Sequence, residues 1–348
     1  MSSSAGDAEA DPLGGASPAG RVLGRALDKV IKHSSWRKHS ALVSACKSAI
    51  DLLSAASSSA PAPAPAPEPS ASPIPGLPAP VAEAALQALL LALDPGSPKV
   101  AEPALECVAS LLSLRLLLGD VAPSDPSPVS RLFAAVLSCG GLGDDALEIA
   151  ALRVLVAFAR CPSVSVRGEC LGQMVKACYN LYLGSASGGN QLCAKLALAQ
   201  VLVVVFARVE ADAMDVRVRT VSAADMMDLS DRSLNDSSVV QAAQTFINEA
   251  MEGSDAPEDA AHVPGEGDRG GEDESMSRIR EDGLALFKNL CKLSMKFATP
   301  DNPDDPVLLR GKVLSLELLR MVVDNAGPFW KTNEKYAHLA MLLLIIYI

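Results

Sequence analysis

The sequence predicts an all-α protein, an armadillo/HEAT-like α-solenoid in which stacked helix pairs are joined by disordered linkers. Of the 348 residues, 49% are hydrophobic but only 4% are aromatic. Leu, Ala and Val must therefore fill the core, which suits helices better than a β-sandwich. Alternating β-branched runs bounded by Asn-Gly turns are absent from the sequence. No clean fixed-period repeat is found, so the solenoid prediction depends on the helical spacing of the apolar residues.

Several segments carry one apolar stripe with a polar back, which is typical of amphipathic helices packed on a neighbour. Clear stripes are formed by Leu86, Leu89, Leu90 and Leu93, by Leu147, Ala151, Val154 and Phe158, and by Leu284, Phe287, Leu290 and Cys291. The apolar run 196–206 contains Gln200 and is shorter than the roughly 20 residues that span a bilayer. We therefore predict that it is a buried central helix and that the chain has no transmembrane segment.

Helix ends are marked by acidic residues and proline. The pairs Asp144–Asp145 and Asp304–Asp305 precede apolar runs, where a helix N-terminus favours negative charge. Asp145 with Glu148 resembles a capping box, and Pro162 follows the end of the same helix. These acidic pairs are therefore interpreted as helix caps and not as catalytic acids.

Three segments have the composition of unfolded chain. They are the N-terminal residues 1–19, the Pro/Ala/Ser-rich insert at residues 57–80, and the acidic linker at residues 251–277. The insert has proline at every second position from 61 to 69, which denies the backbone its helix donors and favours extended conformations. The acidic linker has almost nothing apolar to bury.

Charge and composition exclude several classes of function. The formal net charge of −11 gives no field that would hold a phosphate backbone, so we expect no nucleic-acid partner. The first 20 residues lack the apolar core of a signal peptide, so we expect the chain to stay in the cytosol. The pattern Gly265–Gly270 matches a dinucleotide fingerprint but follows Pro264 and not a strand, amid carboxylates that would repel a pyrophosphate. We expect no catalytic residue, cofactor or metal.

Neither the cysteines nor the histidines have the spacing of a metal site. The eight cysteines lie in apolar periodic segments without CxxC pairs, which predicts reduced, buried thiols in a cytosolic protein. They are Cys46, Cys107, Cys139, Cys161, Cys170, Cys178, Cys193 and Cys291. The four histidines are His33, His39, His262 and His338, and none has a Cys or carboxylate at a spacing that builds a metal site or a triad.

A basic cluster beside an indole is the most prominent local feature, formed by Trp36, Arg37, Lys38 and His39. Two interpretations are open. The cluster could be a solvated helix start with Trp36 packed into the first helix pair, or it could contact a protein partner or an anionic lipid surface.

Three blocks of sequence resemble plant BIG-type ARF exchange factors, in the order in which that family has them. The first is SSWRKHSALVSACKSAIDLL (34–53), and the second spans residues 179–218, beginning YNLYLGSASGGNQLC. The third is FKNLCKLSMKF (287–297), continuing into RGKVLSLELLRMVVDNAGPFWKTNEKY (310–336). The resemblance implies a dimerisation and cyclophilin-binding (DCB) region at residues 20–250. The start of the adjoining region upstream of the exchange domain (HUS) follows at residues 278–336.

The resemblance also implies a function. In that family these helices form an armadillo-like stack that mediates self-association and positions the protein on Golgi or endosomal membranes. The catalytic Sec-seven domain would lie beyond Ile348, so the chain is predicted to be a non-catalytic regulatory and dimerisation region of a large ARF guanine nucleotide-exchange factor in vesicle trafficking. Residues 337–348 are an apolar end that departs from the family. An unrelated armadillo-type adaptor that binds peptides or helical partners is the alternative.

The expected partners are a second copy of the chain, downstream HUS-like helices, small GTPases and an anionic membrane surface. The expected location is the cytosol and, peripherally, trans-Golgi network or endosomal membranes. The candidate partner-contact residues are Trp36, Arg37, Lys38, Tyr179, Asn180 and Tyr182. The last three precede the glycine-rich turn 184–189.

Overall fold

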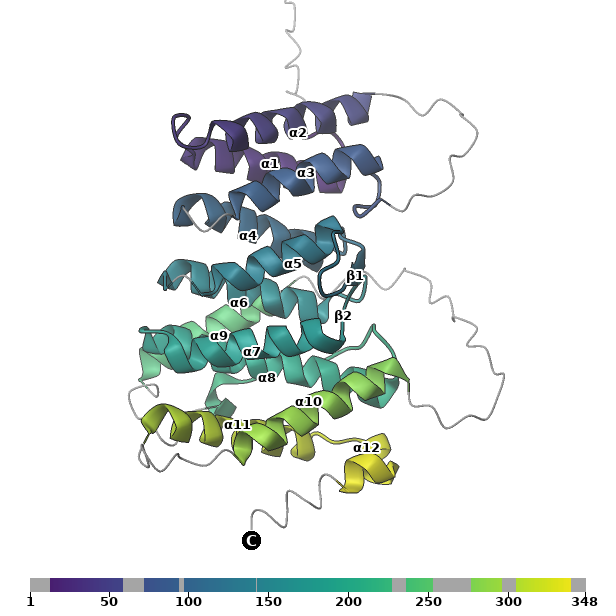
Figure 1. Ribbon diagram of the computed structural model, residues 1–348, viewed down its shortest axis with the longest axis vertical. Helices are drawn as coiled ribbons and strands as arrows, with labels where there is room; N and C mark the ends of the chain where they lie inside the picture. The colour runs from purple at the N-terminus through teal and green to yellow at the C-terminus, as the bar shows by residue number, and fades with distance from the viewer. Residues whose placement is uncertain are drawn as a thin grey trace, which may run out of the picture. The chain divides into compact units, whose positions relative to one another are not determined.

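The computed structural model describes residues 13–58, 72–93, 97–141, 143–226, 236–252, 277–295 and 305–338. Helices dominate these ranges, which confirms the predicted all-α, solenoid-like class (Figure 1). Two short strands also occur, β1 (Gly119–Val121) and β2 (Val164–Val166), which the sequence prediction lacked. The chain divides into two compact units, residues 1–120 with 124–139 and residues 121–123 with 140–348.

The first unit is built from paired helices. They are α1 (Pro18–His33), α2 (Ser40–Ser58), α3 (Ala79–Ala92), α4 (Pro98–Ser113) and α5 (Pro128–Cys139). Helix α1 packs on α2 and α4, α2 packs on α3, and α3 packs on α5. Helix α1 shows why these segments are helical: Ser17 accepts a hydrogen bond from Gly20 N at 3.0 Å, and Pro18 occupies the first turn. Its buried stripe includes Leu23 and Leu27, which are fully covered.

Two predicted unfolded segments are shorter than the composition indicated. Gly14 and Gly15 are buried at positive φ, and a Cβ on Gly14 would overlap the carbonyl of Gly20, so glycine permits this close approach to α1. The predicted insert ends before residue 80, because Ile74 and Leu77 are buried. Residues 59–71, with the alternating prolines, lie outside the described residues, as do 253–276 and 339–348.

The second unit surrounds one long helix, α8 (Gly188–Ala211). Its other elements are α6 (Asp145–Arg160), α7 (Gly168–Gly184), the 3₁₀ turn η1 (Ala223–Met226), α9 (Ser237–Met251), α10 (Arg278–Ser294), α11 (Pro306–Asp324) and α12 (Pro328–Thr332). Helix α8 packs against α6, α7, α9, α10, α11 and α12, which confirms the prediction of a buried central helix. Residues 334–338 are also helical.

Helix α8 is longer than the predicted apolar run. Among the described residues it is the one helix long and apolar enough to cross a bilayer, judged by length and composition, and 83% of its apolar window is buried in the fold. Its polar side chains have partners inside the unit: Gln200 Nε2 donates to the Arg219 carbonyl at 3.1 Å. Arg208 Nε donates to the Met214 carbonyl at 2.8 Å, and burial lowers the pKa of its guanidinium to about 10. These contacts fit a core helix of a folded unit.

The helix caps correct one detail of the sequence interpretation. Asp144, and not Asp145, caps α6, because its carboxylate accepts hydrogen bonds from Ala146 N and Leu147 N, both at 3.1 Å. The Glu148 side chain does not form the hydrogen bond back to the helix start that a capping box would have. It is buried and accepts from Ser185 Oγ at 2.6 Å and from Asn190 Nδ2 at 2.8 Å, so it joins α6 to the turn between α7 and α8.

The second acidic pair behaves as predicted where the structure describes it. Asp305 caps α11 by accepting from Val307 N at 2.9 Å, while Asp304 lies outside the described residues. The end of α6 at Arg160, just before Pro162, is also confirmed.

All eight cysteines are free and buried, as predicted. Burial raises the pKa of Cys107 and Cys178 to about 12, and that of Cys46, Cys139 and Cys291 to about 11. Since the thiolate is the reactive form, these thiols should react slowly in the native fold.

We expect iodoacetamide at pH 8 to label the native chain roughly 100-fold more slowly than the urea-unfolded chain, because both thiolate formation and access are suppressed. Mass spectrometry at timed intervals measures the rate for each cysteine. Equal rates in the native and unfolded chain would contradict the observed burial.

Candidate functional site

Helices α10, α11 and α12 pack against α8, and α10 and α11 also contact α7. Two of the predicted contact residues lie here. We call this surface the α7/α8 junction and define it by Tyr179, Tyr182, Gln191 and Lys195 on one side and Arg310, Gly311, Ser315 and Glu317 on the other.

Tyr182 is fully buried in the α7/α8 junction. The Arg310 guanidinium lies 5.1 Å from the centroid of its ring. Arg310 also donates to the Tyr182 carbonyl at 3.3 Å and to Gln191 Oε1 at 2.6 Å. A single arginine of α11 therefore holds α7 and the start of α8 together, with its charge spread over two acceptors and a ring face.

Tyr179 lies one turn earlier on α7 and is half-buried. Its hydroxyl shares a hydrogen bond with Ser315 of α11, and burial raises its pKa. Gly311 makes room for it, because a Cβ at this position would overlap the Tyr179 hydroxyl. Asn180, the third predicted residue of this group, is exposed. Tyr179 and Tyr182 thus contact helices of their own chain.

A buried ion pair lies at the centre of the junction. Lys195 Nζ of α8 is 2.6 Å from Glu317 Oε2 of α11, and the side chains are 0% and 25% exposed. Taking two charges out of water is costly, so the attraction between them must compensate for lost hydration. Sequence reasoning did not single out this pair. The sequence feature that could have revealed the pair is Lys195 at the start of an apolar run, because a buried ammonium requires an acidic partner.

The C-terminal end of α8 is fastened to α10. Asp212 ends α8 in the left-handed conformation at φ 50° and accepts a hydrogen bond from Ser277, the cap of α10. Arg280 Nη1 lies 3.5 Å from Asp212 Oδ2, and Arg280 Nε donates to the Val209 carbonyl at 3.3 Å. Nε of Arg167, the residue just before α7, lies 3.1 Å from a carboxylate oxygen of Asp282.

An aromatic cluster anchors α12. Trp330 is 5% exposed, and its ring centroid lies 5.1 Å from that of Phe206 and 4.8 Å from that of Phe287. The tilted ring of Tyr336 lies 4.3 Å from Trp330. At the start of α12, Phe329 N donates to Glu210 Oε1 at 2.8 Å. Charge, aromatic packing and backbone hydrogen bonding together fix the last helices on α8.

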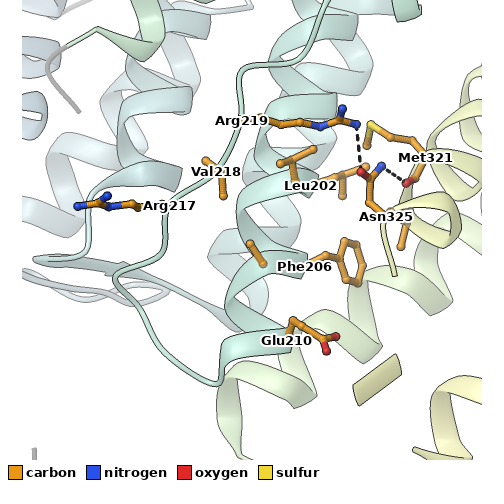
Figure 2. A pocket seen from close by; sticks show the side chains of 11 residues that line it. Leu202, Phe206, Glu210, Arg217, Val218, Arg219, Met321 and Asn325 are labelled. Atoms are coloured by element: carbon orange, nitrogen blue, oxygen red, sulfur yellow. Dashed lines mark hydrogen bonds between the residues drawn. The ribbon is translucent and has the colours of Figure 1, made fainter. Parts of the chain in front are cut away.

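A groove of about 260 Å³ lies between α8, α11 and the extended segment 217–219. Figure 2 shows Leu202 and Phe206 directed into it from α8. Arg219 Nη2 donates to Asn325 Oδ1 at 3.0 Å, which ties the segment to the end of α11 (Figure 2). The lining of the groove combines apolar side chains of α8 and α11 with the polar side chains of Glu210, Arg217, Arg219 and Asn325.

The basic cluster lies in the first unit, in the loop between α1 and α2. Trp36 is 60% exposed, so the interpretation that it packs into the first helix pair is wrong. Lys47 of α2 holds its ammonium 5.7 Å from the indole centroid. Arg37 and Lys38 are exposed. The alternative interpretation, a partner or lipid contact, stays a prediction.

The two tryptophans should give separable fluorescence signals, because Trp36 is exposed and Trp330 is buried among aromatic rings. We expect the Trp36→Phe variant to emit at shorter wavelength and to resist acrylamide quenching, with a quenching constant at least about threefold lower than that of the parent chain. Stern–Volmer titration measures it. A variant as strongly quenched as the parent would contradict the assignment.

The structure shows no group of three or more His, Cys, Asp or Glu side chains suited to a metal ion among the residues that it describes. The glycine pattern 265–270 and His262 fall outside those residues.

Comparison with known proteins identifies the family. The model described as the Mon2/Sec7/BIG1-like dimerisation and cyclophilin-binding domain matches residues 19–213. The chain belongs to this family. The Mon2/Sec7/BIG1-like HUS domain matches residues 279–345, so the DCB and HUS regions follow one another as the sequence resemblance predicted. Helix α9 lies outside both ranges, yet it packs on α6 and α8.

The similar curated proteins are much longer than this chain. Brefeldin A-inhibited guanine nucleotide-exchange protein 1 of Arabidopsis thaliana is 48% identical over 340 residues, covering 96% of this chain and 20% of the relative. Brefeldin A-inhibited guanine nucleotide-exchange protein 4 of the same plant is 42% identical over 352 residues, covering 93% of this chain and 20% of the relative. The human brefeldin A-inhibited guanine nucleotide-exchange protein 1 is 26% identical over 204 residues, covering 55% of this chain and 11% of the relative. The chain thus spans 20% of the length of these two plant relatives.

The α7/α8 junction can now be named as a DCB–HUS contact. Helices α7 and α8 fall in the matched DCB range, and α10 and α11 fall in the HUS range apart from the first residue of α10. Both sides belong to the second compact unit. The HUS region therefore begins as a continuation of the helical packing of the DCB region.

Proposed function

We propose that this chain is the non-catalytic regulatory and dimerisation region of an ARF guanine nucleotide-exchange factor in Golgi and endosomal vesicle trafficking. The observation that carries this proposal is the packing of α10–α12 on α7 and α8. The ion pair and the tyrosines of the DCB–HUS junction hold α11 there, and the aromatic cluster around Trp330 holds α12. Such a junction fixes the direction in which the HUS region continues from the DCB region. The family description as a dimerisation domain and the names of the plant relatives support it.

The proposal assigns binding, and not chemistry, to the chain. Its partners are a second copy through the DCB region, further HUS helices, small GTPases and a membrane surface, with the protein moving between the cytosol and Golgi or endosomal membranes.

Light scattering on the full chain tests self-association. We expect a mass of twice the 36.1 kDa of one chain at tens of micromolar, falling toward one chain on dilution. A strict monomer throughout that range would refute the dimerisation part. In parallel, the chain should not accelerate release of a fluorescent nucleotide from an ARF GTPase, and clear acceleration would refute the non-catalytic part.

A further inference from the structure

We infer that the loop between α1 and α2 is a contact surface for an anionic phospholipid bilayer. We call residues 34–39 the Trp36 loop. The inference rests on the proposed function in that it names the surface by which the chain would meet a membrane. Trp36 is 60% exposed at this loop, with Arg37 and Lys38 exposed beside it and Lys47 5.7 Å from the ring.

The loop presents the indole in a fixed turn. Lys38 N and His39 N both donate to the Ser35 carbonyl, at 3.0 and 2.9 Å. Ser34 closes α1, with its N donating to the Ile31 carbonyl at 3.1 Å and its Oγ donating to the Val30 carbonyl at 2.7 Å. Because the backbone is already ordered by these bonds, contact through Trp36 requires little further loss of conformational entropy.

The segment that comprises α1, the Trp36 loop and α2 carries a net charge opposite in sign to that of the whole chain. Residues 18–58 contain seven cations, Arg21, Arg25, Lys29, Lys32, Arg37, Lys38 and Lys47, against two anions, Asp28 and Asp51, a formal net charge of +5. The complete chain carries −11. Asp28 is paired with Lys32 at 2.6 Å and Lys29 with Glu106 of α4 at 3.3 Å, and Arg37 and Lys38 are the exposed cations of the loop itself. A negative surface would therefore attract this end of the first unit and repel most of the rest.

The composition of the loop favours a bilayer over a protein partner. Protein interfaces concentrate their binding energy in a few residues that cluster in well-packed, fully desolvated pockets. The Trp36 loop offers one indole between serines and cations, and an indole needs no complementary pocket in the headgroup layer of a bilayer, where tryptophan is enriched. Each cation near an anionic leaflet strengthens binding by about fivefold.

Vesicle flotation of the full chain tests this inference. One set of vesicles contains phosphatidylcholine alone, and the other contains phosphatidylcholine and phosphatidylserine in roughly equal parts. We expect binding only to the second kind, a shift of the tryptophan emission to shorter wavelength, and weakening by salt. The emission of Trp36→Phe, which retains only Trp330, should not shift on vesicles.

Paired variants separate the loop from general charge. Replacing both loop cations in R37Q/K38Q should weaken binding by roughly 25-fold and flatten the salt dependence. The matched variant K288Q/K292Q makes the same change of charge at exposed lysines of α10 and should bind like the parent. Trp36→Ala should weaken binding while leaving the salt dependence unchanged, since the indole contributes through apolar burial.

Several results would overturn the inference. They are absence of binding to phosphatidylserine vesicles, equal losses in the two double variants, or unchanged binding by Trp36→Ala. Binding to soluble polyglutamate that is lost in the loop variants, without vesicle binding, would reassign the loop to an acidic protein partner. None of these results alters the light-scattering test of self-association, so failure of the lipid surface and failure of the proposed function are distinguishable.

Discussion

Glu317→Gln should lower the free energy of unfolding of the second unit by about 3 kcal/mol, the largest stability loss that we expect from a single polar substitution. The Lys195 ammonium has no exposed surface and lies 2.6 Å from the Glu317 carboxylate. Glutamine keeps the shape but removes the negative charge, so the ammonium remains in a desolvated position without that compensation. Urea denaturation followed by circular dichroism measures the change.

The same helix provides a matched control. Arg320 and Asp324 of α11 form an i,i+4 pair 3.4 Å apart, with side chains 81% and 63% exposed. Asp324→Asn should change stability by less than about 0.5 kcal/mol, because solvent screens this pair. The double variant K195M/E317M removes both buried charges and should recover most of the loss. If Glu317→Gln were no more destabilising than Asp324→Asn, the buried pair would not stabilise the DCB–HUS junction.

The helices themselves could be predicted from the sequence because their apolar stripes repeat at helical spacing. Leu147, Val154 and Phe158 were predicted to lie on one face of a helix, and all three are buried on α6. The first residue of a helix was harder to predict where two possible capping residues are adjacent. Asp144 and Asp145 both suit a helix start, and the choice is made by the backbone, which is extended at Asp144 with φ −101° and ψ 117°.

The partners of each helix could not be predicted, since a Leu/Ala/Val stripe is satisfied equally by any similar stripe. Tyr179 and Tyr182 illustrate this limit. Both were predicted to contact a partner, but an aromatic side chain gains the same burial from a helix of its own chain as from another protein. The structure places them against α11. Trp36 shows the reverse case, an aromatic side chain that could be packed within the chain but is exposed. Its loop neighbours are serines and cations, which cannot cover an indole.

The compact units also cut across the family regions. The first unit ends at residue 139, within the matched DCB range, and residues 140–213 share the second unit with the HUS helices. Loops rich in Pro or acidic residues look like domain boundaries in a sequence, but compactness depends on which helices pack together. Helices α10 and α11 return to α7 and α8 after an acidic segment of low apolar content, so the linker composition gave no sign of this packing.

Gly311→Ala should destabilise the chain by about 2 kcal/mol, although alanine is the better helix former. The added Cβ would overlap the Tyr179 hydroxyl, and the Tyr179 ring carbon Cζ is the next atom, at 3.3 Å. Either the tyrosine leaves its hydrogen bond with Ser315 or α11 moves away from α7. Both outcomes weaken the DCB–HUS junction, so hydrogen exchange of the α11 amides should accelerate along with the loss of stability.

Once the Tyr179 hydroxyl is removed, Gly311→Ala should have almost no effect on stability. In a Tyr179→Phe background the atom that overlaps the new Cβ is gone, and the helix propensity of alanine, about 1 kcal/mol, offsets the tight contact that remains with the ring carbon Cζ. Tyr179→Phe alone loses one hydrogen bond, about 1 kcal/mol. The double-mutant cycle should therefore show a coupling of about 2 kcal/mol between α7 and α11 in urea denaturation. Additive effects would mean that Gly311 and Tyr179 do not meet, and the observed seating of the HUS region on the DCB region would then be wrong at this point.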